Sequence, residues 1–280
     1  MEILSTVAEV RQWARDRRRA GSVIGLVPTM GALHAGHASL IRAAAASCAS
    51  VAVSIFVNPT QFGPNEDYSR YPRTFEADCA LAKAEGATVV FAPSVEELYP
   101  SGATTFVEVE GLSNRLDGAS RPGHFRGVAT VVAKLMIATE ADRAFFGQKD
   151  AAQVAVIRRI VTDLRLGTEI VVCPIVREAD GLALSSRNVY LSADERVQAL
   201  ALSRAIRQVE ALVAAGERRA GALIEAARQG FAAEPAIRVD YIELVDWSTL
   251  ERVEIAVPGT LFAVAAWVGL TRLIDNTIFG

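Results

Sequence analysis

Cysteine, histidine and lysine are scarce in this chain of 280 residues, which contains only three of each. The cysteines, Cys48, Cys79 and Cys173, are odd in number and widely spaced, so they form neither a disulfide framework nor a metal-ligand pattern. We expect reduced thiols, with Cys48 and Cys173 in the core. The few lysines include Lys149, which is notable among so many arginines because ammonium and guanidinium groups are not interchangeable.

The chain also lacks a strong net charge and long apolar runs. Its formal charge of −3 excludes an overall basic field for nucleic acid or membrane surfaces. No apolar run is long enough for a membrane span, and residues 1–21 have no signal-peptide core. We therefore expect a cytoplasmic protein. With 51% hydrophobic and 22% charged residues, the chain should form a sizeable core in one large or two modest domains.

Short apolar runs alternate with helical patterns through the first two thirds of the sequence. The expected strands are residues 23–27, 51–57, 88–91, 143–146 and 169–173, and the expected helices are 37–47, 74–85, 127–138 and 151–164. This alternation predicts an α/β fold with a Rossmann-like parallel sheet. Ligands bind at the carboxyl ends of such strands, so chemistry is expected in the polar segments 29–37, 58–73 and 147–150.

The pattern changes near residue 176. Helices are expected at 192–215, opened by a Ser192–Glu195 capping box, and at 219–232, followed by strands at 239–245, 260–268 and 271–274, the last two paired through Gly269. Helices followed by antiparallel strands predict a smaller C-terminal α+β domain. The expected domains are therefore residues 1–175, which bind nucleotide and substrate, and residues 176–280, which cover the site.

The segment Pro-Thr-Met-Gly-Ala-Leu-His-Ala-Gly-His, residues 28–37, joins the first apolar strand to a helix. His34 and His37 are three residues apart and share one face of the helix start. Unpaired backbone N–H groups and the helix dipole favour anions there, which suits a polyphosphate. The alternative is two ordinary surface histidines, which the glycine-containing turn after a strand makes the weaker reading.

A second motif, Gly147-Gln148-Lys149-Asp150, follows another expected strand. Lys149 can reach a phosphate as a point charge, and Asp150 can accept from a ribose hydroxyl. In the alternative reading Lys149 is a surface residue and Asp150 a helix cap. The loop Leu184-Ser185-Ser186-Arg187-Asn188 offers hydroxyls and a guanidinium to phosphate, a weak signal on its own.

Two further loops supply candidate substrate contacts. Gln61 carries both a donor and an acceptor, which suits a substrate hydroxyl or carboxylate, and residues 62–73 have the composition of a mobile lid. The basic loop 121–127 either supplies an arginine for a carboxylate or is simply solvated.

These segments together resemble the pantothenate synthetase (pantoate–β-alanine ligase) family. The residues that carry the resemblance are PTMGALHAGH, SIFVNPTQFGPNEDYSRYPRT, RPGHFRGV, FGQKD with Gln153, and LSSRN, in this order. The resemblance implies ATP-dependent condensation of (R)-pantoate with β-alanine to pantothenate, through a pantoyl adenylate, with release of AMP and pyrophosphate. It also implies a nucleotidyltransferase-type sheet.

The resemblance assigns roles residue by residue. His37, His34 and Lys149 match the catalytic positions, and Gln61 and Gln153 match contacts to pantoate and β-alanine. The implied ATP-binding residues are Met30, Gly31, Ala32, Leu33, His34, Ala35, Gly36, His37, Gly147, Gln148, Lys149, Asp150, Val176, Leu184, Ser185, Ser186 and Arg187. Leu184 stands where methionine is common in the family, a near volume-conserving exchange.

The implied partners are small molecules: ATP as a substrate with Mg²⁺, pantoate and β-alanine. A homodimer is expected. The sequence does not identify the metal ligands; Asp78 and Asp150 are two possible ones. Two other hypotheses remain: another nucleotidyltransferase that joins a nucleotide to a phosphorylated substrate, and a nucleotide-binding regulatory module without catalysis.

Overall fold

The computed structural model describes residues 1–64, 66–232, 234 and 236–280, so Asn65 of the predicted lid lies outside the described residues. The chain forms two compact units. The first comprises Met1–Gly147 and Val156–Pro174, and the second comprises Gln148–Ala155 and Ile175–Gly280. The short segment Gln148–Ala155, which the sequence places in the first domain, therefore groups with the second unit.

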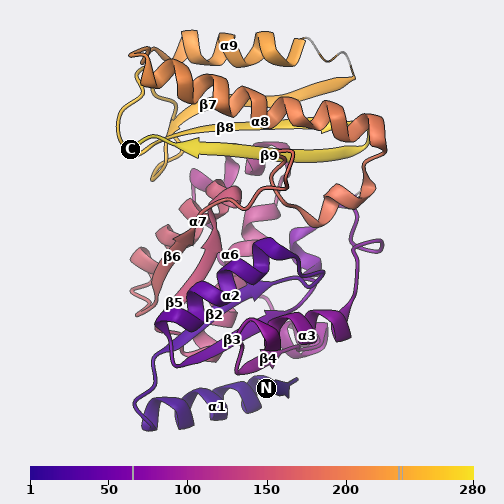
Figure 1. Ribbon diagram of the computed structural model, residues 1–280. Helices are drawn as coiled ribbons and strands as arrows, with labels where there is room; N and C mark the ends of the chain where they lie inside the picture. Colours follow the sequence, from indigo (N-terminus) through magenta and orange to yellow (C-terminus); the bar gives the residue numbers. More distant parts are fainter. Residues whose placement is uncertain (65, 233, 235) are drawn as a thin grey trace. The chain divides into compact units, whose positions relative to one another are not determined.

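A six-stranded parallel sheet forms the centre of the first unit (Figure 1). Its strands are β1 (Glu2–Leu4), β2 (Ile24–Thr29), β3 (Ser50–Ile55), β4 (Val89–Phe91), β5 (Arg143–Gly147) and β6 (Glu169–Cys173). Their order is β1-β4-β3-β2-β5-β6. The chain runs outward from β2 in one direction and then returns to β5, so β2 and β5 form the topological switch point where open α/β sheets bind ligands.

Helices flank this sheet because its strands are apolar on both sides. The helices that follow its strands along the chain are α1 (Val7–Arg19), α2 (Ala35–Ser47), α3 (Phe75–Ala84), α4 (Val95–Leu98), α5 (Asp117–Ser120), α6 (His124–Thr139) and α7 (Ala151–Asp163). The residues of α7 are divided between the two units. Ile41 of α2 and Ala82 of α3 pack with Val27 and Val53 in one core cluster, while α1 packs against α6.

The second unit is a three-stranded antiparallel sheet covered by two helices. Strands β7 (Ile237–Asp246), β8 (Thr260–Val268) and β9 (Thr271–Ile278) are joined in that order. Helices α8 (Ala193–Ala214) and α9 (Ala220–Ala232) pack with the sheet around a core that includes Leu202, Leu223 and Phe262. The predicted capping box is present, since Ser192 Oγ accepts from the Glu195 N–H and Glu195 accepts from the Ser192 N–H.

The fold class predicted from the sequence is confirmed, and the differences lie in short elements and at element ends. Strand β1 was not predicted; it is three residues long and lies next to β4 at the sheet edge. Helix α6 begins at His124 rather than 127, because Gly123 adopts the left-handed conformation that starts it. Strand β9 extends to Ile278, beyond the predicted residue 274, because its polar residues Asp275 and Asn276 are buried rather than solvated.

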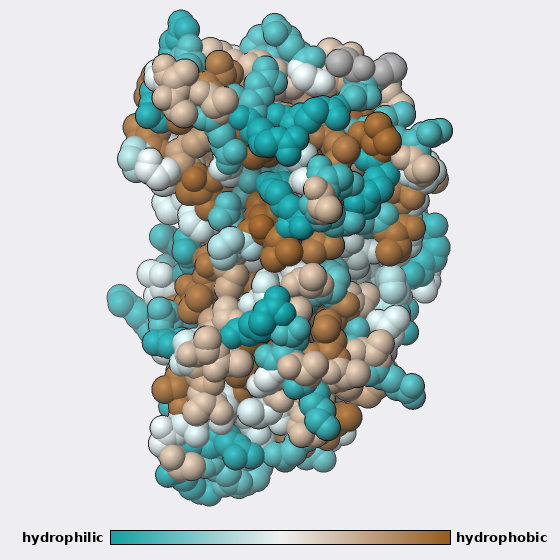
Figure 2. Space-filling model, viewed as in Figure 1, coloured by the Kyte–Doolittle hydropathy of each residue, from teal (hydrophilic) through white to brown (hydrophobic). Residues whose placement is uncertain are grey.

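The three cysteines are free thiols, and Cys48 and Cys173 are buried as predicted. Within the described ranges, no helix has the length and apolar character needed to traverse a bilayer. Polar and apolar residues are interspersed on the face shown in Figure 2. Single exposed apolar side chains such as Leu270, in the tight turn between β8 and β9, are ordinary features of protein surfaces.

Candidate functional site

The loop between β2 and α2 has an unusual backbone conformation. Gly31 has φ +83°, and Ala32, a residue with a side chain, has φ 49°. A Cβ on Gly31 would lie 3.0 Å from Asp78 Oδ2, so the backbone can approach that carboxylate closely only because residue 31 is glycine. Such strained backbone persists where surrounding contacts determine it.

Asp78 supplies those contacts from the first turn of α3. Its Oδ2 accepts from the Ala32 N–H at 3.0 Å, and its Oδ1 accepts from the Leu33 N–H at 2.8 Å. Thr74 Oγ1 donates to the same Oδ1 at 3.0 Å. Asp78 is 2% exposed, so its charge is satisfied by hydrogen bonds rather than by water. Asp78 was a candidate metal ligand from the sequence; it instead holds the loop.

His34 and His37 form a reciprocal cap at the start of α2. His34 Nδ1 accepts from the Gly36 N–H at 3.1 Å, and His37 Nδ1 accepts from the His34 N–H at 3.3 Å. Their ring centroids are 4.2 Å apart. Since each Nδ1 accepts, each neutral ring carries its proton on Nε2. The cap thus sets both imidazoles in the tautomer whose Nε2–H can donate to a phosphate oxygen.

Gln61 lies at the end of the short 3-10 helix η1 (Pro59–Gln61), after β3. Its side chain reaches the β2–α2 loop, because Nε2 contacts Met30 Sδ at 3.2 Å. Its Oε1 accepts from Asn58 Nδ2 at 3.0 Å. The structure therefore brings Met30, His34, His37 and Gln61 together at the carboxyl ends of the adjacent strands β2 and β3, within the first unit.

Asn58 is a residue whose role the sequence reasoning missed. It is 1% exposed; its Nδ2 also donates to the Gly127 carbonyl at 3.2 Å, and its Oδ1 accepts from Tyr99 Oη at 2.9 Å. Burial raises the pKa of Tyr99, so the phenol keeps its proton to donate. The sequence does place Asn58 directly before a proline, at the carboxyl end of an expected strand, and this position was the available signal.

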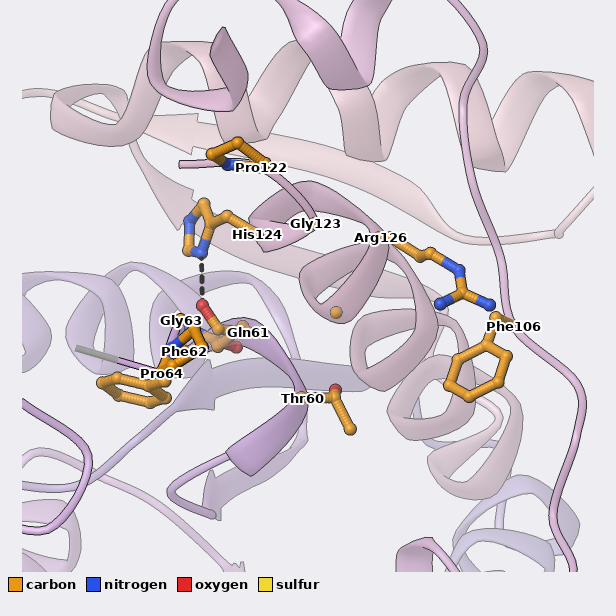
Figure 3. A pocket seen from close by; sticks show the side chains of 11 residues that line it. Thr60, Gln61, Phe62, Gly63, Pro64, Phe106, Pro122, Gly123, His124 and Arg126 are labelled. Carbon is orange, nitrogen blue, oxygen red and sulfur yellow. Dashed lines mark hydrogen bonds between the residues drawn. The ribbon is translucent and has the colours of Figure 1, made fainter. Parts of the chain in front are cut away.

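A cavity of about 200 Å³ lies between η1 and the start of α6 (Figure 3). Its lining includes Thr60, Gln61, His124 and Arg126, with Arg126 stacked on Phe106 at 3.8 Å from the ring centroid. His124, the first residue of α6, is hydrogen-bonded to η1 on the other side of the cavity, because its Nδ1 lies 2.8 Å from the Gln61 carbonyl oxygen.

Arg121, in the loop 121–127, binds a carboxylate of the chain itself, that of Glu66. The role of this loop toward a substrate carboxylate stays a prediction. Arg121 Nε and Nη2 donate to the two oxygens of Glu66, both at 2.7 Å. Burial alone would raise the pKa of Glu66, but the hydrogen bonds and charge of Arg121 lower it to about 2. The bidentate pair attaches the described part of the predicted lid to the loop that precedes α6.

Arg121 also fixes the protonation of His124. Its Nη1 lies 2.9 Å from His124 Nε2 and can only donate, so Nε2 accepts and Nδ1 carries the proton toward Gln61. Burial and the positive charge of Arg121 lower the pKa of His124 to about 4. This histidine is therefore neutral near pH 7 and serves as a fixed hydrogen-bond donor.

The remaining predicted residues, apart from Gly147, lie in the second unit. Gln148, Lys149 and Asp150 form the 3-10 helix η3 (Gln148–Asp150), in which Lys149 is half-buried and Asp150 is exposed, and Gln153 is half-buried in the following helix. Gly147 is the last residue of β5. The predicted ATP and substrate residues thus fall into two sets, one in each unit.

Val176 to Arg187 form a small hairpin and its exit. The Leu184 N–H donates to the Val176 carbonyl at 3.0 Å, and Gly181 turns the chain with φ +96°. Ser185 then caps the 3-10 helix η4 (Ser186–Tyr190), its Oγ accepting from the Arg187 N–H at 3.2 Å. Leu184 thus takes part in the hairpin through its backbone.

No group of three or more His, Cys, Asp or Glu side chains is placed to hold a metal ion in the part of the chain that the structure describes. Mg²⁺ is commonly held by one or two carboxylates together with substrate phosphates, so a preformed protein cage is not required for it.

A parallel sheet with a capped helix start at its switch point is the architecture of nucleotide-binding α/β proteins. The family model described as pantoate-beta-alanine ligase matches residues 2–278, and the chain belongs to this family.

Relatives and solved structures of the family match along the whole chain. The pantothenate synthetase of Acidobacterium capsulatum is 60% identical to this chain, over 100% of this chain and 97% of that protein. The pantothenate synthetase of Thermotoga neapolitana is 54% identical, over 100% of both chains. The crystal structure of the Thermus thermophilus pantothenate synthetase has a TM-score of 0.94 at 45% identity, covering 100% of both chains. That of the Francisella tularensis pantoate-beta-alanine ligase, complexed with β,γ-ATP and β-alanine, has a TM-score of 0.81 at 34% identity, covering 99% of this chain and 97% of that one.

We predict that Asp78→Asn destabilises the β2–α2 loop. The amide has one acceptor oxygen, and its NH₂ group would face a backbone N–H. The free energy of unfolding in urea should fall by about 1–3 kcal/mol, and the Ala32 and Leu33 amides should exchange faster with solvent. Glu76→Gln, which changes an exposed carboxylate on the same helix, is the control. Unchanged exchange at both amides would contradict the role of Asp78.

We also predict a pH-dependent stability that belongs to His124. Its pKa is about 4 in the folded protein and near 6.5 when unfolded, so the unfolded chain binds the extra proton first and stability falls as pH drops from 6.5 toward 4. When the pH falls from 7.5 to 4.5, the free energy of unfolding should decrease by about 2–3 kcal/mol more in the parent protein than in His124→Gln. The free energy of unfolding in urea at both pH values measures this, and equal losses in both proteins would refute it.

Proposed function

We propose that this protein is a pantothenate synthetase that condenses (R)-pantoate with β-alanine, consuming ATP and releasing AMP and pyrophosphate. The observation that carries the proposal is the family match over residues 2–278, which includes both compact units. The complex of the Francisella tularensis relative with β,γ-ATP and β-alanine supports the choice of substrates.

In the first step the pantoate carboxylate attacks the α-phosphorus of ATP, and pyrophosphate leaves. This brings two anions together, so the protein must neutralise charge and align the reactants. His34 and His37, at the positive end of α2, donate from Nε2 to phosphate oxygens. We assign the same task to Lys149, Ser185, Ser186 and Arg187 of the second unit, and the other ATP contacts to the backbone of residues 30–37, 147–150, 176 and 184.

Gln61 and Gln153 orient pantoate. An amide offers both a donor and an acceptor without a positive charge that would weaken the carboxylate as a nucleophile. Gln61 suits this task because its carbonyl is held by His124 and its side-chain oxygen by Asn58, so the residue is fixed before substrate arrives. A preorganised side chain loses less freedom on binding than a mobile one.

In the second step the β-alanine amine attacks the acyl carbon of pantoyl adenylate; the C–N bond forms, the acyl–phosphate bond breaks, AMP leaves with its electron pair and the nitrogen releases one proton. Water would hydrolyse the same adenylate, so the site must exclude it. We assign this role to the loop of residues 62–73, whose described part is attached by the Glu66–Arg121 ion pair to the loop that precedes α6.

We further propose that Mg²⁺ enters on the phosphates of ATP, where it neutralises charge, since Asp78 is committed to the loop and a preformed cluster is not needed. The free thiols agree with a cytoplasmic location. The homodimer expected from the family resemblance is proposed as well, and sedimentation equilibrium would measure it.

The deciding experiment incubates the protein with ATP, Mg²⁺ and pantoate, with and without β-alanine. Pantothenate and AMP should appear together only when both acids are present. A stable nucleotide-containing product that forms without β-alanine would favour another nucleotidyltransferase. AMP release that responds to neither acid would exclude the ligase.

We predict that His34→Asn and His37→Gln lose activity while keeping the helix. Asparagine is a good N-cap and glutamine a good N3 residue, so both caps of α2 survive without the imidazoles. The value of kcat/KM for adenylate formation should fall by about 10²–10³-fold, while the melting temperature changes little. Arg42→Gln, which breaks an exposed ion pair on the same helix, is the control. Activity within threefold of the parent in both histidine variants would overturn the assignment.

A further inference from the structure

Two consecutive residues of β9 contact both of the candidate ATP segments of the second unit. Asp275 and Asn276 are 2% and 4% exposed, and neither belongs to a motif that the sequence analysis singled out. A buried carboxylate and a buried amide side by side in an apolar sheet are costly unless each polar atom has a partner. Their partners lie in η3 and in the hairpin that begins at Val176.

Every polar group of the Asn276 side chain contacts η3. Its Nδ2 donates to the Gln148 carbonyl at 3.1 Å and to the Lys149 carbonyl at 2.8 Å. Its Oδ1 accepts from Gln148 Nε2 at 3.3 Å. Trp247 Nε1 adds a hydrogen bond to the Ala151 carbonyl at 3.0 Å. These contacts explain why residues 148–155 group with the second unit, and they fix the peptide that carries Lys149.

Asp275 holds the second segment. Its carboxylate accepts from Arg177 Nη1 at 2.6 Å and Nη2 at 2.9 Å, a bidentate pair. Arg177 Nη1 also donates to the Gly181 carbonyl at 3.2 Å, across the hairpin turn. Arg177 follows Val176, and the hairpin leads directly to Ser185 and Arg187. The ion pair therefore fixes the base of the segment that carries the two serines and Arg187.

Strand β9 gives both residues a rigid support. Asp275 pairs with Val264 and Asn276 with Ala263 of β8, which is buried along most of its length. Consecutive side chains of a strand point to opposite faces, so one short piece of backbone can set two segments at once. Thr277 shares the face of Asp275, and its Oγ1 donates to Glu210 of α8 at 2.7 Å, which is remote in sequence from both ATP segments.

We propose that Asp275 and Asn276 are positioning residues for ATP, which set the spacing between Lys149 on η3 and Ser185–Arg187 beyond the hairpin. The proposal rests on the proposed function, because it requires that these two segments bind the nucleotide. Neither residue needs to touch ATP. A misplacement of about 1 Å in a binding group can cost about 10²-fold in rate, so the effect should exceed the loss of two hydrogen bonds on the surface.

The test compares Asn276→Asp, Asp275→Asn and, as a matched control, Thr277→Val. Asn276→Asp keeps the shape but removes both donations to the η3 carbonyls. Thr277→Val removes a buried hydrogen bond from the same strand to Glu210 of α8, and it leaves the hydrogen bonds of Asp275 to Arg177 and of Asn276 to η3 in place. ATP binding is measured by calorimetric titration without pantoate, so that no reaction occurs. Melting temperatures are measured in parallel.

We expect the ATP Kd to rise at least tenfold in Asn276→Asp and at least fivefold in Asp275→Asn, and to stay within twofold in Thr277→Val at a comparable melting temperature. A double-mutant cycle with Lys149→Ala identifies the route. If Asn276 acts through Lys149, Asn276→Asp adds less than threefold to the ATP Kd of Lys149→Ala. If Asn276→Asp does not fold, Asn276→Ser, whose hydroxyl has a single donor, takes its place.

An ATP Kd in Asn276→Asp and Asp275→Asn within twofold of the parent overturns the positioning role, and so does an equal loss of affinity in Thr277→Val. These outcomes are distinct from failure of the proposed function. If the parent protein binds ATP but makes no pantothenate, the proposed function is wrong. The ATP titrations of the variants still test the positioning role in that case. A parent that makes pantothenate, with variants that bind ATP normally, removes the positioning role alone.

Discussion

The buried carboxylate of Asp78 is the interaction on which the first half of the site depends. It binds two successive backbone N–H groups of a loop that includes a non-glycine residue at positive φ. Without it, two partly buried donors would lose their partners, and the start of α2 would lose its entry angle. The caps made by His34 and His37 require that entry angle, because both use N–H groups of the first turn. The orientation of the imidazoles is thus fixed by a residue on another helix.

The same logic extends from the loop to the substrate side of the first unit. Gln61 is held at its backbone by His124 and at its side chain by Asn58, and His124 is held in one tautomer by Arg121. Each link is a buried polar group whose partner leaves it a single orientation. Fully satisfied networks of this kind rigidify a site, while partly satisfied ones destabilise it. The low pKa of His124 follows from its burial and then from this arrangement, since a second proton on its ring would face the charge of Arg121.

The sequence predicts the parts of this architecture that depend on local pattern. Apolar runs of strand length predict β2 and β5, and the glycine-containing turn with two histidines predicts the start of α2. Asp78 could not be assigned from sequence, because its partners at Ala32 and Leu33 lie 46 and 45 residues away. Asn276 is hidden for the same reason, since Gln148 and Lys149 precede it by 128 and 127 residues. The division between the units likewise depends on these long-range bonds rather than on a linker composition.

The β2–α2 loop of the first unit and η3 of the second are supported by opposite chemistry. In the first, the anionic Asp78 accepts from backbone N–H groups, and its charge is spread over three donors. In the second, the neutral amide of Asn276 donates to backbone carbonyls of η3. A carboxylate could not replace this amide, because it has no proton to donate and would repel both carbonyls. It would also place a negative charge beside the peptide of Lys149, opposing the phosphates that this lysine is proposed to bind. Asn276 thus fixes the backbone of Lys149 and places no negative charge nearby that would compete with phosphate for the ammonium group.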